Sequence, residues 1–196
     1  MKKQTYTEKR DFTKSPEPRE TKEKRRKNGD PIFVIQKHDA TNLHYDFRLE
    51  IDGTLKSWSV PKGPSTNPAI KRMAIPTEDH PMEYANFEGT IPKGQYGGGT
   101  VMVWDTGTFI NLKKNEEGEP ISLSESYKMG SLEFSLKGKK LQGGYALVEM
   151  KGGKMKGNWL LMKLNDDFAD ARRNPVNTQK ESVLTGRNLK EIAEEK

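Results

Sequence analysis

Residues 33–51, which read FVIQKHDATNLHYDFRLEI, decide the fold of this chain. Two runs in which apolar and polar side chains alternate flank a polar break at residues 39–42, a pattern typical of a β-hairpin. Successive side chains of a strand point to opposite faces of a sheet, so the apolar residues of the second run share one face. The polar residues on its other face are His44, Asp46, Arg48 and Glu50. The pattern predicts a strand pair with one core face and one polar face.

Short candidate strands recur along the rest of the chain. Asp52 and Gly53 supply a tight turn into the next strand at residues 55–60. Further candidate strands lie at residues 72–75, 99–104, 107–112, 131–136, 144–149 and 158–163. Helical patterns occur only near residues 166–173 and 188–195. We therefore predict a mainly β fold, a compact β-barrel of short, mostly antiparallel strands with one or two short peripheral helices.

The net charge of +6 is concentrated at the N-terminus. The first 30 residues carry 11 Lys and Arg against 6 Asp and Glu, and they lack hydrophobic periodicity. Such a segment is either a solvated arm or a tether for nucleic acid. We expect a basic, largely flexible leader at residues 1–30, a barrel at residues 31–165 and a C-terminal helical tail at residues 166–196.

The composition excludes several classes of site and of protein. The absence of cysteine rules out disulfides, thiolate nucleophiles and cysteine-bound zinc, so any metal must use His, carboxylate or carbonyl ligands. No apolar stretch approaches the roughly 20 residues of a membrane span, and no apolar segment follows the charged N-terminus. We expect a cytoplasmic protein.

The three histidines fall within 43 residues, and two of them belong to the predicted hairpin. His44 and Asp46 are two residues apart on one strand and share a face, and the hairpin can bring His38 alongside them. Two imidazoles and one carboxylate form a three-point site with open positions, which suits a catalytic divalent metal. The alternative is an ordinary exposed polar face, which the clustering of so rare a residue disfavours.

Other polar groups extend this candidate site. Arg48 continues the polar face, where it could bind phosphate oxygens through two N–H groups or pair with a neighbouring acid. His80 falls in an irregular acidic stretch, which predicts a loop that is either catalytic or merely exposed. Residues 92–99, PKGQYGGG, have the composition of a phosphate-binding loop but match no known spacing, so a glycine-rich turn is the simpler interpretation.

Two long motifs resemble a known family. Residues 33–50, quoted above, and residues 85–99, ANFEGTIPKGQYGGG, are similar to the signature of the 3′-phosphoesterase domain of bacterial DNA ligase D. The similarity extends from about Arg10 into the 160s. It implies a compact β-barrel with a crescent groove. It also implies that Mn²⁺, or another divalent transition metal, is held by His38, His44 and Asp46.

The same resemblance implies roles for further residues. Arg48 and His80 would contact the scissile phosphate, and Tyr84 would support it. Gln36, Lys62, Arg72 and Glu78 would line the site. Asp11 and Glu17 match leader acids that the family uses, which implies that part of the leader folds onto the site.

The resemblance also implies a reaction. The enzyme would act on the 3′ ends of a nucleic-acid primer-template duplex, removing a 3′-terminal ribonucleoside and then the 3′-phosphate to leave a 3′-OH. This is a step of DNA repair by non-homologous end joining, with an end-joining ligase or polymerase as the expected partner. Residues 182–187 resemble the segment that precedes the ligase domain, so a stand-alone enzyme or an excised domain is implied.

Two other functions fit part of the pattern. His44, Asp46 and His80 imitate the facial triad of a non-haem Fe(II) oxygenase, but this interpretation leaves His38 and Arg48 without a role. A metal-free nucleic-acid-binding barrel would use the basic leader and the aromatic side chains, but it does not explain the grouping of His and Asp. We therefore predict a metal-dependent 3′-phosphoesterase.

Overall fold

The predicted hairpin is present in the computed structural model, which describes residues 4–21 and 29–195. Strands β1 (Ile32–Asp39) and β2 (Leu43–Ile51) pair antiparallel, with His38 opposite His44. The apolar residues of β2, Tyr45, Phe47 and Leu49, are buried in the core, as the alternation predicts. The polar residues of β2 therefore lie on the outer face of the sheet.

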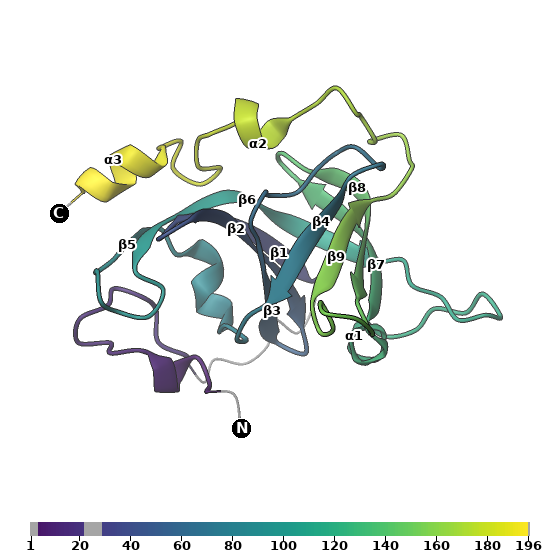
Figure 1. Cartoon of the computed structure of the whole chain (residues 1–196), viewed down its shortest axis with the longest axis horizontal. Coiled ribbons are helices and arrows are strands. Elements are labelled where there is room, and N and C mark those ends of the chain that lie inside the picture. The colour runs from purple at the N-terminus through teal and green to yellow at the C-terminus, as the bar shows by residue number, and fades with distance from the viewer. Residues whose placement is uncertain (1–3, 22–28, 196) are drawn as a thin grey trace.

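Nine strands of the described residues form one antiparallel sheet in the order β1-β2-β3-β4-β9-β8-β7-β6-β5 (Figure 1). Pairing of β1 with β6 closes eight of them into a barrel, to which β5 adds an outer strand. The remaining strands are β3 (Thr54–Val60), β4 (Lys71–Pro76), β5 (Gly89–Ile91), β6 (Gly99–Asn111), β7 (Ser131–Gly138), β8 (Gln142–Glu149) and β9 (Trp159–Lys163). The prediction of a mainly β barrel is confirmed.

Strand β6 differs from the prediction, because the two strands expected at residues 99–104 and 107–112 are continuous. The glycine that suggested a turn has another purpose. A side chain at Gly107 would place its Cβ 2.2 Å from the carbonyl oxygen of Lys137 on β7. Gly107 therefore permits close approach of two strands and does not mark a chain reversal.

The helices agree only in part with the prediction. The helix expected at residues 166–173 is absent, because the Asp166 side chain accepts hydrogen bonds from the backbone of Gly144 and Phe168 and holds a turn. The predicted C-terminal helix is present as α3 (Leu189–Glu194). The other short helices are the 3₁₀ helices η1 (Thr7–Lys9) and η2 (Met82–Asn86), and the α-helices α1 (Leu123–Met129) and α2 (Pro175–Thr178).

Helix α1 was not predicted, although its ends carry ordinary signals. The Ser122 side chain caps its N-terminus by accepting a hydrogen bond from the backbone of Glu125. Gly130 ends it in the left-handed conformation at φ 75°. The helix is only seven residues long, which is too short for a clear helical period.

The C-terminal tail packs on the barrel. The indole N–H of Trp104 donates to the carbonyl oxygen of Gln179 at 2.6 Å. Ile192 on α3 is 2% exposed and belongs to the same apolar cluster as Trp104. Figure 1 shows the tail crossing one side of the barrel, with α3 beside β5 and β6. The tail and the barrel therefore share one core.

The leader is described in part. Residues 4–21 lie against the barrel, with Tyr6 buried in a second apolar cluster that includes Tyr84. Residues 1–3 and 22–28, on which the prediction of a flexible leader partly falls, lie outside the described residues. Among the helices of residues 4–21 and 29–195, none combines the length and the apolar character of a membrane span.

Truncation of Ile192 tests whether the tail contributes to the core. Ile192→Ala should lower the free energy of unfolding by about 2–5 kcal/mol, because it leaves a cavity among packed side chains. Leu184→Ala, at a tail position that is 44% exposed, should change it by less than about 0.5 kcal/mol. Urea unfolding followed by tryptophan fluorescence measures both values. Equal stability of the two variants would show that the tail adds nothing to the core.

Candidate active site

Three potential metal ligands meet on the outer face of β1 and β2. The ligand atoms of His38, His44 and Asp46 lie within 4.8 Å of one another. His38 Nδ1 is 3.6 Å from one carboxylate oxygen of Asp46, and His44 Nε2 is 3.5 Å from the other. The pairing of His38 with His44 across the two strands brings these groups together. One ion could contact all three side chains.

The imidazoles are suited to a divalent transition metal. His44 Nδ1 lies 2.8 Å from the carbonyl oxygen of Asn42, which accepts only, so this nitrogen carries the proton and Nε2 presents its lone pair. His38 Nε2 is buried and has no hydrogen-bond partner in the described residues. A buried nitrogen with no partner is costly, and a metal ion held by the His38 ring, whose Nδ1 faces Asp46, would stabilise such an imidazole. The residues present therefore fit such an ion.

The charge state of the carboxylate also favours a cation. Burial raises the pKa of Asp46, but the charge of Arg48 and the contacts with His38 and His44 outweigh burial and hold that pKa well below its usual range. Burial lowers the pKa of His44, and the contact with Asp46 more than compensates, so the pKa of His44 is raised. Asp46 is thus an ionised ligand at neutral pH.

Arg48 is fixed by hydrogen bonds to neighbouring strands. Its Nε donates to Gln36 Oε1 on β1 at 2.8 Å, and its Nη1 donates to Ser57 Oγ on β3 at 2.8 Å. Its Nη2 donates to Asp46 Oδ2 at 3.1 Å. The side chain is almost completely buried. A guanidinium of the kind that can bind phosphate oxygens is therefore held directly beside the three potential metal ligands.

His80 stands apart from the three-residue metal group. Its Nδ1 lies 2.9 Å from Arg48 Nη1, and its Nε2 lies 3.3 Å from Arg10 Nη2. Burial lowers the pKa of His80 well below its usual range, and the charges of Arg48 and Arg10 lower it further. His80 is therefore neutral, with a guanidinium at each ring nitrogen, and this arrangement does not support a facial triad that includes it.

Part of the leader completes the cleft. The Arg10 guanidinium donates to Glu17 at 2.8 Å and to Glu78 at 3.0 Å, and it stacks 3.8 Å from the ring centroid of Tyr6. Tyr84 donates from its hydroxyl to the same Glu17 carboxylate at 3.1 Å. The residues Arg10, Glu17, Glu78 and Tyr84 line one cleft with the metal group, Arg48 and His80.

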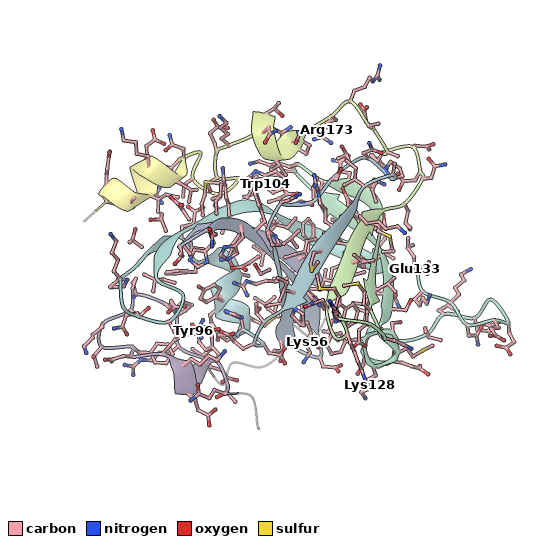
Figure 2. The ribbon with its side chains drawn as sticks, viewed as in Figure 1. Lys56, Tyr96, Trp104, Lys128, Glu133 and Arg173 are labelled. Atoms are coloured by element: carbon pink, nitrogen blue, oxygen red, sulfur yellow. The ribbon has the colours of Figure 1, made fainter. Side chains whose placement is uncertain are left out.

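Two groups in the cleft were missed by sequence reasoning. Arg10 was seen only as the first residue of the resemblance, and nothing in a charged leader distinguishes it from its neighbours. Tyr96 comes from the glycine-rich loop and lies beside the leader (Figure 2). Its hydroxyl contacts both Glu78 and Lys9, at 3.2 and 2.9 Å. The only sign of Tyr96 in the sequence was the presence of an aromatic residue inside a glycine-rich turn.

Four predicted residues do not line the cleft. Gln36 lies beneath it and orients Arg48. Asp11 is bonded locally to Thr13, and Lys62 is exposed in the loop after β3. Arg72 is two residues from the buried core residue Ala74 on β4, so the two share a face of that strand. That face is opposite to the one that carries the site. Roles for Asp11, Lys62 and Arg72 remain predictions.

Comparison with known proteins gives a consistent result. The family model described as the DNA ligase D 3′-phosphoesterase domain matches residues 36–149. The multifunctional non-homologous end joining protein LigD of Pseudomonas aeruginosa is 45% identical over 186 residues, which cover 94% of this chain and 21% of that protein.

Mycobacterial relatives are similar. The multifunctional non-homologous end joining DNA repair protein LigD of Mycobacterium tuberculosis is 42% identical over 82% of this chain and 19% of its own length. The LigD protein of Mycolicibacterium smegmatis is 43% identical over 83% of this chain and 20% of its own length. The chain thus spans about a fifth of the length of the relatives it matches.

The neutral state of His80 predicts a pH dependence of stability. Unfolding exposes an imidazole with an ordinary pKa of about 6.5, so below that pH the unfolded chain takes up a proton that the folded chain does not. The stability due to neutral His80 is therefore complete above about pH 6.5 and is lost as the pH falls toward the lowered pKa.

His80→Gln should remove this dependence. Between pH 7 and pH 5, the wild-type protein should lose stability faster than the variant, by up to about 1.4 kcal/mol per pH unit. Urea unfolding in a chelator at several pH values measures the difference. Parallel curves for the two proteins would mean that His80 is not held neutral.

Proposed function

Because the chain belongs to the family of DNA ligase D 3′-phosphoesterase domains, we propose that it is a metal-dependent hydrolase that heals the 3′ ends of nucleic acids. It removes 3′-terminal ribonucleosides and 3′-phosphates from primer ends and leaves a 3′-OH. One observation carries the proposal. A group of three metal ligands and a buried arginine lie side by side in one cleft.

His38, His44 and Asp46 would hold the metal. Two imidazoles and one carboxylate form a donor set that suits Mn²⁺ and other transition metals better than Mg²⁺, which prefers oxygen ligands. When bound, such an ion supplies Lewis-acid stabilisation to a phosphate oxygen. Asp46 supports this role because it stays ionised, and the Asn42 carbonyl supports it by fixing the tautomer of His44.

Arg48 provides a fixed positive charge for the phosphate. Gln36, Ser57 and Asp46 hold its guanidinium before any substrate arrives. A donor that is already oriented needs no rearrangement as negative charge develops on the phosphate oxygens. Arg48 therefore binds the scissile phosphate and stabilises the transition state.

His80 and Arg10 form the opposite wall of the cleft. The Glu78 carbonyl oxygen, 2.9 Å from Nδ1, only accepts, so a neutral His80 carries its proton on Nδ1 and accepts a hydrogen bond from Arg10 at Nε2. The negative charge of an incoming phosphate raises the tendency of His80 to take up a proton. His80 can then contact the phosphate or protonate the leaving oxygen, and Tyr84 supports this wall through Glu17.

The biological setting of the reaction is proposed from the relatives. Proteins named for non-homologous end joining match most of this chain, so we place its substrate among the broken DNA ends that such repair processes. An end-joining ligase or polymerase would use the 3′-OH that this reaction produces.

An end-healing assay tests the proposal. The protein should convert a 3′-phosphorylated primer-template to a 3′-OH end with Mn²⁺ and lose this activity in excess chelator. Gel electrophoresis of a 5′-labelled primer resolves the two ends. Full turnover in chelator, or no turnover with any divalent transition metal, would refute the proposed function.

Substitution of Arg48 tests its role in the same assay. Arg48→Ala should lower kcat by roughly 10²- to 10³-fold, as loss of one preorganised donor typically does. Arg48→Lys keeps the charge without the forked geometry, so its kcat should lie between those of the wild-type and Arg48→Ala proteins. Arg172→Ala, at a side chain that is 94% exposed, is the control. A folded Arg48→Ala protein with the activity of the control would contradict the assignment.

A further inference from the structure

Beside the cleft lies a groove lined by residues of the β1–β2 turn and of the glycine-rich loop that follows β5. Ala40, Ile91 and Gly97 line both spaces, so the groove adjoins the cleft. Ala40 is two residues beyond the metal ligand His38. A strand whose end lies at the metal group can therefore pass directly into this groove.

The groove is lined by groups that bind sugar and phosphate oxygens. The lining includes Thr41, Thr90, Thr100, Gln95 and Lys93 and is otherwise mostly glycine, and the hydroxyls of Thr90 and Thr100 bond each other at 3.1 Å. Proteins contact the nucleic-acid backbone with these groups, whereas stacking on bases needs aromatic rings, which are absent from the described lining. Its chemistry suits a backbone of any base sequence.

Glycine brings the loop into this position. A side chain at Gly99 would place its Cβ 2.4 Å from the carbonyl oxygen of Asp39, so only glycine lets the loop approach the end of β1 so closely. At Gly94, with φ +87°, a side chain would meet no atom within 4 Å. The backbone of the loop is bare here, and a ligand can approach it closely.

Charge favours this groove over two other grooves that adjoin the cleft in the described part of the chain. The groove beside His80 carries the carboxylates of Glu20, Asp79 and Glu83. The groove beside Tyr96 carries those of Glu78 and Asp79, with Lys9 as its cation. The glycine-rich groove has one lysine and one carboxylate. A polyanion is repelled least where Lys93 stands.

We propose that the glycine-rich groove holds the nucleic-acid backbone on the 5′ side of the scissile phosphate, and that Lys93 binds a phosphate of that segment. This inference rests on the proposed function and adds the path of the retained strand. Lys93 lies outside the cleft, so it contributes to binding of long substrates and takes no part in the chemistry.

Lys93→Ala tests the groove with substrates of two lengths. With a 3′-phosphorylated oligonucleotide, kcat/KM should fall by up to about fivefold, as expected for an exposed ion pair. The slope of log kcat/KM against log salt concentration should become less steep by about one, as expected for the loss of one phosphate contact. With thymidine 3′-phosphate, which has no upstream phosphate, kcat/KM should stay unchanged. Oligonucleotides of two different sequences should respond alike.

Lys128→Ala is the matched control, at an exposed lysine on α1, apart from the loop that carries Tyr96 (Figure 2). This variant should have wild-type kcat/KM with both substrates. Wild-type activity on the oligonucleotide in Lys93→Ala would overturn the inference, and so would an equal loss on both substrates. If the wild-type protein did not turn over the 3′-phosphorylated oligonucleotide, the proposed function itself would be refuted. Failure of the inference and failure of the proposed function are therefore distinguishable.

Discussion

A buried guanidinium is tolerated only where its donors are paired, and this requirement organises the site. Arg48 is 2% exposed and bonds to Gln36, Asp46 and Ser57, one residue from each of three adjacent strands. All of these side chains must point outward, so the register of β1, β2 and β3 is constrained. A slip of one residue would turn the polar set into the core and expose the apolar set. The metal ligands depend on the same register, because His38 faces His44 across these strands.

The leader satisfies the second half of the site. Arg10 occupies the far side of His80 and pairs with Glu17 and Glu78, and Lys9 is a second cation at Glu78. Arg48 lies between His80 and Asp46, so its guanidinium joins the wall formed by His80 and Arg10 to the group of metal ligands. A fixed guanidinium beside a group of metal ligands is an arrangement that can stabilise the charge of a phosphate ester under attack.

Features set by local patterning were predictable from sequence, and features set by distant contacts were not. The alternation in β2 gave both the barrel and the grouping of His44, Asp46 and Arg48. The helix expected at residues 166–173 is absent because the Asp166 side chain bonds to the backbone of Gly144 on β8. The position of Arg10 depends on a partner almost 70 residues away, Glu78. No periodicity within a charged leader reveals such a contact.

The central claim is that His38, His44 and Asp46 form the metal site and that His80 belongs to the phosphate wall. Calorimetric titration of Mn²⁺ into the purified wild-type, His38→Ala, His44→Ala and His80→Ala proteins tests it most directly. His38→Ala and His44→Ala should lose the metal, because each removes a ligand. His80→Ala should bind Mn²⁺ with a Kd within about tenfold of the wild-type value. Residues that orient a metal ligand typically contribute about 10- to 100-fold to metal affinity, and His80 is not hydrogen-bonded to any of the three ligands. Loss of Mn²⁺ by His80→Ala together with its retention by His38→Ala would contradict the account.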